Sequence, residues 1–249
     1  MHFIDIHSHI LPGLDDGSYN REDSLEMARI AEAGSISHII CTPHAEVGCR
    51  YSANELLSVL KLTAGHFSGS GNNIVLHPGQ EILIRNSAAE VPEALRRGEL
   101  LTLAGSDCVL IEFKPHETAE GIYHAAEVIA RGGYTPIIAH PERYIAIAEE
   151  RGLAHDLHAC GALLQINKGS LTGFFGKTAE STVRRLLENE QADFLASDAH
   201  GSYVRSPALA EAHEWISLHY SPEYADHLLI GNPTRILNGE KITPVHYFD

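Results

Sequence analysis

Short apolar runs alternate with amphipathic segments along the whole sequence, and this alternation restricts the fold more than any other feature. The runs lack the regular polar and apolar alternation of a half-buried strand, which is typical of parallel strands buried on both faces. We therefore predict an α/β fold. The predicted strands are Phe3–Ile6, His38–Cys41, Ile74–His77, Val109–Ile111, Thr135–Ala139, Ala162–Ile166 and Phe194–Ala196.

The segments between the strands have helical periodicity. Ser52 and Glu55 have the S-x-x-E spacing of a capping box, and Gly34 follows the first segment. No linker or repeat divides the chain, so we expect one domain over residues 1–249, a (β/α) barrel of about seven strands. A doubly wound open sheet is the alternative. The predicted helices are Arg21–Ala33, Ser52–His66, Ala88–Arg97, Thr118–Arg131, Glu142–Arg151, Thr178–Glu190, Ser206–His219 and Thr234–Leu237.

Composition narrows the class of protein. The chain has 18 Lys and Arg against 33 Asp and Glu, a net charge of −15 that disfavours broad binding to nucleic acid or to an anionic membrane. Its 17 histidines favour a metalloenzyme, because histidine and carboxylates are common metal ligands. We expect a soluble, cytoplasmic protein, since no signal peptide or membrane-length apolar run occurs. No C-x-x-C pair links the cysteines, which we expect to be packed free thiols: Cys41, Cys49, Cys108 and Cys160.

Histidines and carboxylates follow six of the seven predicted strands. The carboxyl ends of parallel barrel strands open on one face, so these side chains converge there. His7-Ser8-His9 and Asp198-Ala199-His200 each place two side chains on one side, a spacing that can chelate one ion. A single histidine is more often a capping or core residue, and a salt bridge can satisfy a buried carboxylate, but the whole set predicts a metal site. The candidate ligands are His7, His9, His44, Glu81, Glu112, His140, Asp198 and His200.

A turn close to the first motif adds a further acid. Asp15 and Asp16 precede Gly17 in a segment rich in Pro and Gly, where they could simply cap the turn. Beside His7 and His9, we expect one of the two to be a ligand.

Two arginines follow ligand positions. Arg143 lies three residues after His140 and Arg205 five after His200, and each could instead be a surface charge on a following helix. In so acidic a chain, their placement favours an anionic substrate such as a phosphate. The sequence has no G-x-S-x-G esterase motif. Residues 173–178, GFFGKT, lack the first glycine of a P-loop and are interpreted as a loop that leads into a helix.

Seven short motifs occur in order between residue 3 and about residue 205: DIHSH at 5–9, DDG at 15–17, TPH at 42–44, GQE at 79–81, LIE at 110–112, AHPERY at 139–144 and SDAH at 197–200. This set resembles the PHP (polymerase and histidinol phosphatase) superfamily. Within it, the chain is most similar to the bacterial CpsB/CapC-like protein-tyrosine phosphatases of capsule and exopolysaccharide synthesis.

The resemblance implies a single distorted (β/α)7 TIM-like barrel, the PHP fold, with three divalent metal ions at the carboxyl ends of its strands. The metal is commonly Mn²⁺, with Fe, Zn, Co or Mg as alternatives. Arg143 and Arg205 match the phosphate-gripping arginines of the family. By position, the ligands form three groups with Glu81 shared: His7, His9, Glu81 and Asp198; Glu81, Glu112 and His140; and Asp16, His44 and His200.

The resemblance also implies a reaction and a partner. The expected activity is hydrolysis of phosphotyrosine by in-line attack of a metal-bridging hydroxide. The expected substrate is the tyrosine-rich tail of a bacterial tyrosine kinase that controls polysaccharide export. The loop after His44, AEVGCR at 45–50, departs from the more basic or polar stretch of several relatives. Family members form rings or dimers, but nothing in this sequence identifies an interface.

Three alternatives remain open at this point. One is a histidinol-phosphate phosphatase of the same superfamily. Another is a TatD-like nuclease or an amidohydrolase, disfavoured by the net charge of −15 and by Glu112 where an amidohydrolase has Lys. The third is a catalytically silent metal-binding protein, which the presence of both Arg143 and Arg205 disfavours.

Overall fold

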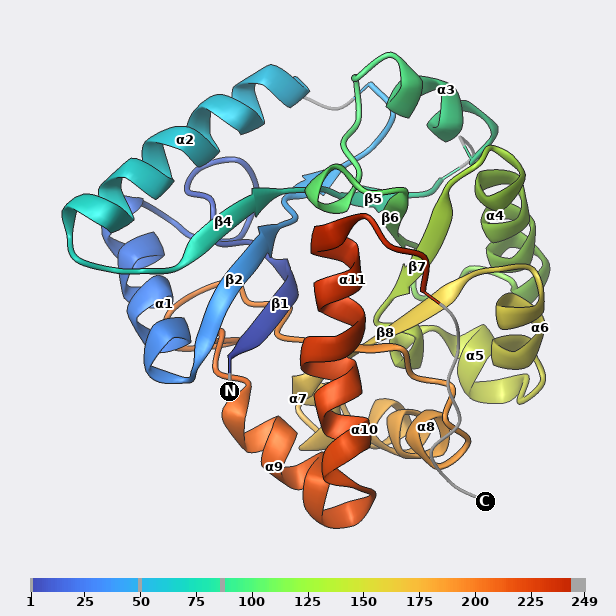
Figure 1. The fold of residues 1–249 in the computed structure, drawn as a ribbon. Coiled ribbons are helices and arrows are strands. Elements are labelled where there is room, and N and C mark those ends of the chain that lie inside the picture. The colour runs from blue at the N-terminus through green and yellow to red at the C-terminus, as the bar shows by residue number, and fades with distance from the viewer. Residues whose placement is uncertain (1, 49–50, 86–87, 243–249) are drawn as a thin grey trace.

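The strands of this protein are all parallel to their neighbours. The computed structural model describes residues 2–48, 51–85 and 88–242, and Figure 1 shows their path. The predicted α/β class with parallel strands is confirmed. The described strands are β1 (Phe3–Ser8), β2 (Ile36–Cys41), β3 (His44–Ala45), β4 (Val75–Pro78), β5 (Glu81–Leu83), β6 (Cys108–Glu112), β7 (Thr135–Ala139), β8 (Leu163–Asn167) and β9 (Phe194–Ala196).

These strands form two sheets, with the orders β1-β2-β4 and β3-β5-β6-β7-β8-β9. Neighbours follow chain order in both sheets, whereas a doubly wound sheet reverses its order at a switch point, so the alternative of a doubly wound sheet is wrong. A parallel bridge between Ser8 and Ala199 links the end of β1 to the segment after β9.

Two predicted strands continue beyond a short interruption. β2 is followed by β3 after Thr42-Pro43, and β4 by β5 after Gly79-Gln80, so His44 and Glu81 lie on strands rather than in loops beyond them. Pro43 has no N–H for a strand ladder, which explains the first interruption. At the second, a Cβ on Gly79 would meet Cγ2 of Ile40 at 2.8 Å, so only glycine fits there.

A small apolar cluster combines residues from both sheets. It takes Ile4 and Ile40 from the first sheet, and Leu110 and Phe194 from the second, all buried. Ile236 of α11 joins this cluster, and Figure 1 shows α11 crossing in front of the strands. α11 also contacts η2, which directly precedes β6, so it covers the amino ends of the strands and leaves their carboxyl ends to the polar residues.

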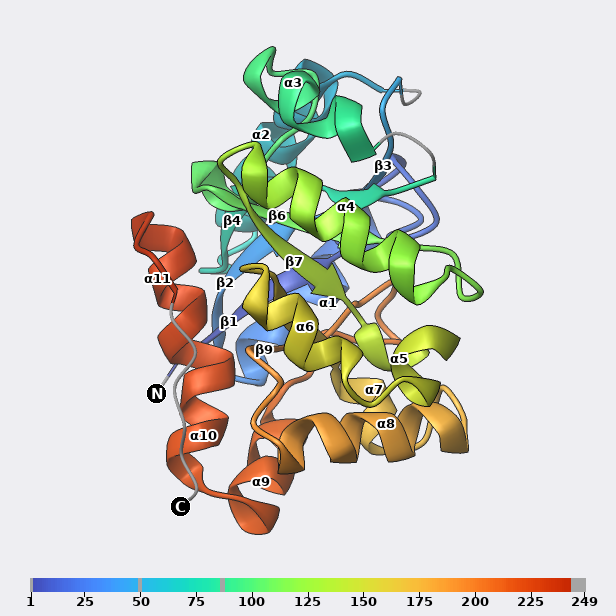
Figure 2. The same cartoon turned by 90° about the vertical axis from the view of Figure 1, so that its right-hand side faces the viewer.

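Helices cover the outer face of the strands, and a second, larger apolar cluster lies between them. Figure 2 shows α4 and α6 on the side of the sheet that faces the viewer, outside β7. α4 contacts β7, and α6 contacts β8. The α-helices are α1 (Arg21–Ala33), α2 (Ala53–Gly69), α3 (Val91–Arg96), α4 (Ala119–Arg131), α5 (Ile145–Glu149), α6 (Leu153–Ala159), α7 (Lys168–Leu171), α8 (Lys177–Glu188), α9 (Ala210–His219), α10 (Pro222–Asp226) and α11 (Asn232–Asn238). The shorter turns are η1 (Ala88–Glu90), η2 (Leu103–Gly105), η3 (Pro141–Arg143) and the π-type η4 (His227–Gly231).

Most predicted helices are confirmed, and the Ser52–Glu55 capping box is present at the start of α2. The prediction of one helix over Glu142–Arg151 is wrong. It is replaced by η3 and the short α5, because Tyr144 between them has an extended backbone with ψ of 130°. The predicted start at Ser206 is also too early, since α9 begins at Ala210 and Pro207 disfavours a helical Ser206.

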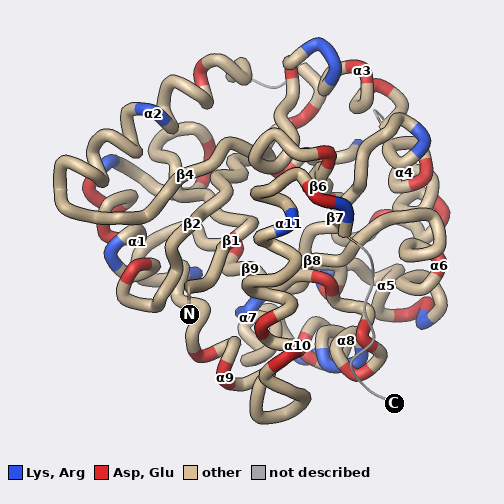
Figure 3. The backbone as a smooth tube through the Cα atoms, in the orientation of Figure 1, with Lys and Arg blue, Asp and Glu red and all other residues tan. Residues whose placement is uncertain are grey.

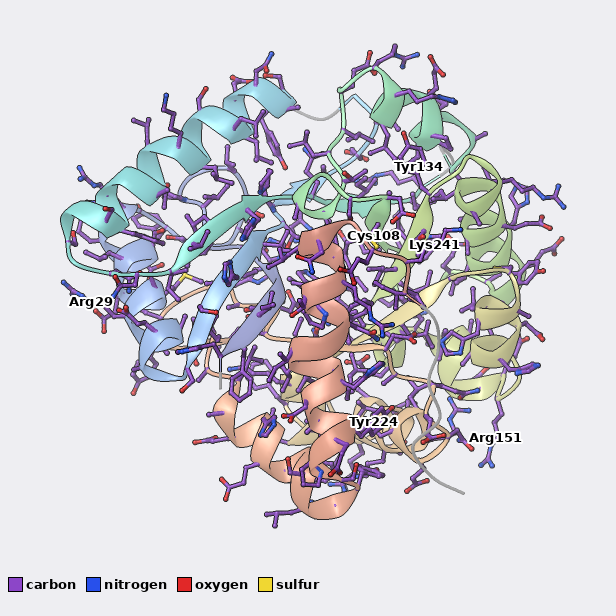
Figure 4. All side chains as sticks on the ribbon, in the orientation of Figure 1. Arg29, Cys108, Tyr134, Arg151, Tyr224 and Lys241 are labelled. Carbon is purple, nitrogen blue, oxygen red and sulfur yellow. The ribbon has the colours of Figure 1, made fainter. Side chains whose placement is uncertain are left out.

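The C-terminal helices are anchored to the strands by polar contacts. Tyr224 on α10, labelled in Figure 4, is buried, and its hydroxyl donates to the carbonyl of Ala192 at 3.1 Å. The side-chain amide of Asn232 donates to the carbonyl of Asp193 at 2.9 Å. Both acceptors precede β9, so these contacts hold α10 and α11 against the end of the second sheet.

The described cysteines are free thiols, as predicted. Cys41 and Cys108 are buried, and Cys160 is partly buried. Burial raises the pKa of Cys108 to about 12 and also raises the pKa of Cys41, so neither is a ready nucleophile. Cys49 lies outside the described residues.

The charged residues are spread over the outer helices. Figure 3 shows Asp and Glu along α1, α4, α8 and α9, with Lys and Arg among them. Among the described residues, no helix combines the length and the apolar character needed to cross a membrane.

Candidate metal centre

All nine predicted ligands and both predicted arginines lie at or beyond the carboxyl ends of the longer strands, or on β3 and β5, which follow β2 and β4. β1 carries His7, with His9 just beyond it, β3 begins at His44, β5 begins at Glu81, and β6 ends at Glu112. The other predicted residues lie in the segments that follow β1, β7 and β9: Asp16, His140, Arg143, Asp198, His200 and Arg205.

The first group surrounds His7 on β1 and His9 just beyond it. Their Nε2 atoms are 3.2 Å apart, and they lie 3.2 and 3.3 Å from Oε2 of Glu81. Oδ1 of Asp198 is 3.5 Å from His7 and 3.6 Å from His9. All four side chains are buried. The structure therefore brings together the first predicted ligand group.

The second group is built on the two glutamates. Nε2 of His140 lies 2.8 Å from Oε1 of Glu81 and 3.9 Å from Oε2 of Glu112, as predicted for a shared site. Nδ1 of His44 lies 3.0 Å from a carboxylate oxygen of each glutamate, a proximity that the sequence did not indicate.

The third group lies nearer to solvent. Oδ1 of Asp16 is 3.4 Å from Nε2 of His44 and 3.5 Å from Nε2 of His200. His9 has a ligand atom within 4.8 Å of those of all three, so it stands between the first and third groups. Ligand atoms of His44, Glu81 and Glu112 also lie within 4.8 Å of one another.

The carboxylates make this cluster strongly attractive to cations. Burial alone would lower the pKa of His9, but the nearby carboxylates of Asp15 and Glu81 outweigh it and raise the pKa to about 9. For His44, the carboxylates of Glu112 and Glu81 likewise outweigh burial and raise the pKa to about 11. The pKa of His200 is lowered to about 4, first by burial and then by the positive charges of His9 and Arg205.

The residues present fit divalent metal ions. Oε2 of Glu81 is fully buried and has no hydrogen-bond partner among the described residues, although ring nitrogens of His7, His9 and His44 lie within 3.3 Å of it. An orphaned carboxylate oxygen at that depth is costly unless a cation binds it. A set of imidazole and carboxylate donors suits Zn²⁺, Mn²⁺ and Fe²⁺.

Three site residues have left-handed backbones, which is unusual for residues other than glycine. The φ angles are 35° at His140, 48° at Asp198 and 54° at Arg205. Strained backbone of this kind concentrates at functional sites, where the surrounding structure holds it in place. The strain falls here on two predicted ligands and one predicted phosphate-binding arginine.

Polar residues that the sequence analysis did not select hold the ligands from behind. Oε1 of Gln165 lies 2.7 Å from Nδ1 of His7, and the amide of Gln165 donates to Asn167 at 2.9 Å. Asn167 donates to Oδ2 of Asp198 at 2.6 Å. Gln165 and Asn167 are two residues apart on the otherwise apolar β8, and that same-face spacing is the signal that could have identified them.

Asp15 has a comparable position behind another ligand. Its Oδ2 lies 2.6 Å from Nδ1 of His9 and accepts the backbone N–H of His44 at 2.9 Å, while Oδ1 accepts the N–H of Gly17. A Cβ on Gly17 would collide with the carbonyl oxygen of His9, so glycine lets this turn approach the site. Of the two acids of the turn, Asp16 faces the histidine cluster and Asp15 supports it.

The two arginines meet at one carboxylate. Nη2 of Arg205 lies 2.5 Å from Oδ1 of Asp198, and Nη1 of Arg143 lies 3.5 Å from Oδ2. Their side chains are only 23% and 33% exposed, so both guanidinium groups lie beside the buried cluster rather than in open solvent.

Comparison with known proteins agrees with this arrangement. The family model for capsular polysaccharide synthesis, CpsB/CapC, matches residues 3–238. The tyrosine-protein phosphatase YwqE of Bacillus subtilis is 39% identical over 222 residues, which are 84% of this chain and 82% of YwqE. The tyrosine-protein phosphatase CpsB of Streptococcus pneumoniae is 30% identical over 245 residues, which are 96% of this chain and 100% of CpsB.

A solved structure shows the same fold. It comes from work on YwqE of Bacillus subtilis and CpsB of Streptococcus pneumoniae, described as unique metal-dependent tyrosine phosphatases. The TM-score is 0.89 at 33% sequence identity, and the match covers 98% of this chain and 100% of that one. This chain therefore belongs to the CpsB/CapC family of capsular polysaccharide synthesis.

Proposed function

We propose that this protein is a metal-dependent protein-tyrosine phosphatase. The observation that carries the proposal is the position of Asp198, which lies within 3.6 Å of both His7 and His9 and forms ion pairs with both arginines. A cation site and an anion-binding pair therefore adjoin, as hydrolysis of a phosphate monoester requires. The relatives described above are named tyrosine phosphatases, which agrees with this reaction.

The nine clustered side chains hold three divalent metal ions in this proposal, with Mn²⁺ as the expected metal. The groups are those predicted from the sequence, with His9 and His44 placed close enough to serve neighbouring sites. Bound metals supply Lewis acidity and make hydroxide available near neutral pH. Glu81, in contact with four histidines, is the expected bridging ligand.

The protein's own residues bind and orient the phosphoryl group. Arg143 and Arg205 provide planar donors that suit the oxygens of a phosphate dianion and stabilise the charge that spreads over them in the transition state. Water adds to phosphorus, the bond from phosphorus to the tyrosyl oxygen breaks, and tyrosine leaves. A phenol has a pKa of about 10, so this leaving group needs little help from a general acid. We assign Asp15 no role as a general acid, because both of its oxygens already accept hydrogen bonds.

The fold of the proposal is a single PHP-type domain over residues 1–249 whose two sheets form one distorted (β/α)7 barrel. Three observations support this. β2 and β3 continue one another, as do β4 and β5, which reduces the strands to seven. The Ser8–Ala199 bridge links the end of the first strand to the segment that follows the last. Both sheets contribute to one interior cluster.

The proposed substrate is a phosphotyrosine in the tyrosine-rich tail of a bacterial tyrosine kinase, and the proposed location is the cytoplasm. A cavity of about 410 Å³ opens beside His44 and Glu112 and offers Leu14, Tyr51 and Leu83 as lining for an aromatic ring. Glu46, in the loop that follows His44, forms an ion pair with Arg85 at 2.6 Å. The two opposite charges offset each other on this wall of the cavity.

The test compares substrates on one preparation. The manganese-loaded protein is assayed on a phosphotyrosine peptide, histidinol phosphate and single-stranded DNA, before and after chelation and after return of Mn²⁺. We expect chelator-sensitive, manganese-restored hydrolysis of the phosphotyrosine peptide at the highest kcat/KM. Faster turnover of histidinol phosphate or of DNA would replace the proposed function with the corresponding alternative.

A further inference from the structure

The GFFG segment at 173–176 is a loop that leads into a helix, as predicted from the sequence. It connects α7 to α8, and the glycines at its two ends have φ angles of 74° and 92°. Such angles suit glycine and turn the chain sharply, so the two phenylalanines project from a tight loop. Phe174 is 58% exposed, whereas Phe175 is partly buried.

The ring of Phe175 lies against both arginines of the site. Cζ of Arg143 is 4.8 Å from the ring centroid, and Cζ of Arg205 is 5.7 Å from it. Both distances are within the range of a cation–π interaction. The arginines come from separate segments, one in η3 after β7 and the other in the loop after β9, and Phe175 is a contact that they share.

Two further residues contact the ring of Phe175 and restrict its position. Phe174 packs against it edge to face, with centroids 5.0 Å apart and planes at 87°. Gly169 lies so close that a Cβ there would come within 3.0 Å of Cε2 of Phe175. The ring is therefore a fixed surface against which long, flexible arginine side chains can rest.

The two guanidinium groups need such a surface because they repel each other. Both form ion pairs to the carboxylate of Asp198, which the proposed function gives to a metal. Arg205 also donates from Nε to the backbone carbonyl of Asp198 at 3.1 Å, so Arg143 relies more on the ring than Arg205 does. The electron-rich face of an aromatic ring attracts both cations without competing for the hydrogen bonds that a phosphate requires.

We propose that Phe175 is a positioning residue that holds the guanidinium groups of Arg143 and Arg205 ready to bind a phosphoryl group. The identity of that group rests on the proposed function, whereas the ring contacts do not. Phe175 touches neither the substrate nor the metals in this account and acts through the two arginines.

The test compares F175L, which keeps apolar bulk but removes the π face, with F175Y, which keeps that face. F174L is the matched control, because Phe174 belongs to the same loop and leucine keeps apolar bulk against the Phe175 ring, while the cation–π contacts with Arg143 and Arg205 are made by Phe175. For F175L we expect the KM for a phosphotyrosine peptide and the Kd for inorganic phosphate to rise about fivefold or more, with a smaller change in kcat. F175Y and F174L should remain near the wild type, and metal content should be equal in all four proteins.

A second measurement is independent of activity. NMR relaxation of the Nε–Hε groups of Arg143 and Arg205 should show greater motion of both in F175L than in the wild type or F174L. Unchanged arginine order together with unchanged phosphate Kd in F175L would overturn the proposal, as would equal losses in F175L and F174L. A wild-type protein that hydrolyses no phosphotyrosine would refute the proposed function, while the arginine relaxation would still decide the role of Phe175.

Discussion

Nδ1 of His9 lies 2.6 Å from Oδ2 of Asp15, and that same oxygen accepts the backbone N–H of His44 at 2.9 Å. One carboxylate outside the ligand set thus orients the ring of one candidate ligand and fixes the backbone of another. Carboxylate–histidine pairs of this kind set which ring nitrogen is free to bind a metal and increase its basicity.

Replacing Asp15 by Asn should weaken metal binding while leaving every candidate ligand in place. An amide cannot supply the negative charge beside Nδ1 of His9, so we expect the affinity for Mn²⁺ to fall about 10- to 100-fold. Calorimetric titration of the metal-free protein measures it. D107N is the control, since it makes the same change in charge at the opposite end of the strands, where Asp107 directly precedes β6. Equal losses in both variants would assign the effect to net charge alone.

Gln165 should matter for stability even without metal. Its Oε1 lies 2.7 Å from Nδ1 of the fully buried His7, so Q165L leaves a polar atom without a partner. A buried unsatisfied group costs about 1–3 kcal/mol, and we expect the free energy of unfolding in urea to fall by about that amount. Q191L, a change at a partly exposed glutamine after α8, should stay within about 0.5 kcal/mol of the wild type. A wild-type value for Q165L would mean that another group takes over this contact.

Arg143 should act on turnover and not on metal content. It is 3.5 Å from Asp198 and 33% exposed at the edge of the cluster. Removing a donor that stabilises transition-state charge costs about 100-fold or more, so kcat/KM of R143A for phosphotyrosine should fall by that order. R96A removes a surface arginine paired with Glu93 on α3 and should keep full activity. Unchanged turnover in R143A would exclude this arginine from the mechanism.

The pair of His158 and Asp193 predicts a pH-dependent part of the stability. Nε2 of His158 lies 2.8 Å from Oδ2 of Asp193, and although burial opposes the charged ring, the hydrogen bond to Asp193 outweighs it and raises the pKa of His158 above its usual 6.5. A raised pKa in the folded state means that the protonated ring stabilises the fold. That stabilisation is complete below about pH 6.5 and is lost as the pH rises through the folded pKa.

Urea unfolding of the wild type and H158Q measures this contribution to stability. The free energy of unfolding of the wild type should exceed that of the variant by a larger margin at about pH 5.5 than at about pH 8.5, because the ring of His158 loses its charge at the higher pH. The difference between the two proteins cancels the titration of the histidines in the metal centre. A margin that grows with pH would have the opposite sign and contradict the assignment.

Much of the fold followed from the sequence because the strands are short, apolar and separated by well-marked helices. α1 has the predicted bounds of Arg21–Ala33, and β7 and β9 also match their predicted ranges. The Glu142–Arg151 helix failed because the left-handed φ of 35° at His140 and the extended Tyr144 depend on tertiary contacts that periodicity does not record. The short β3 and β5 were missed because each follows an interruption in a longer strand.

The convergence of the candidate ligands was predictable because parallel strands end on one face. Their supporting residues were not. Gln165 and Asn167 serve the site only through contacts to His7 and Asp198, far away in the sequence. Phe175 lies in a segment that was correctly predicted as a loop leading into a helix, but its contact with both arginines depends on how three segments pack.

The central claim is that the histidine and carboxylate cluster is a metal centre that hydrolyses phosphotyrosine. Mass spectrometric metal analysis of the pure protein, with phosphotyrosine hydrolysis measured on the same sample before and after chelation and manganese return, tests it most directly. The account predicts about three metal ions per chain and activity that chelation abolishes and Mn²⁺ restores. A protein that carries no metal, or that hydrolyses phosphotyrosine equally well after complete chelation, would contradict it.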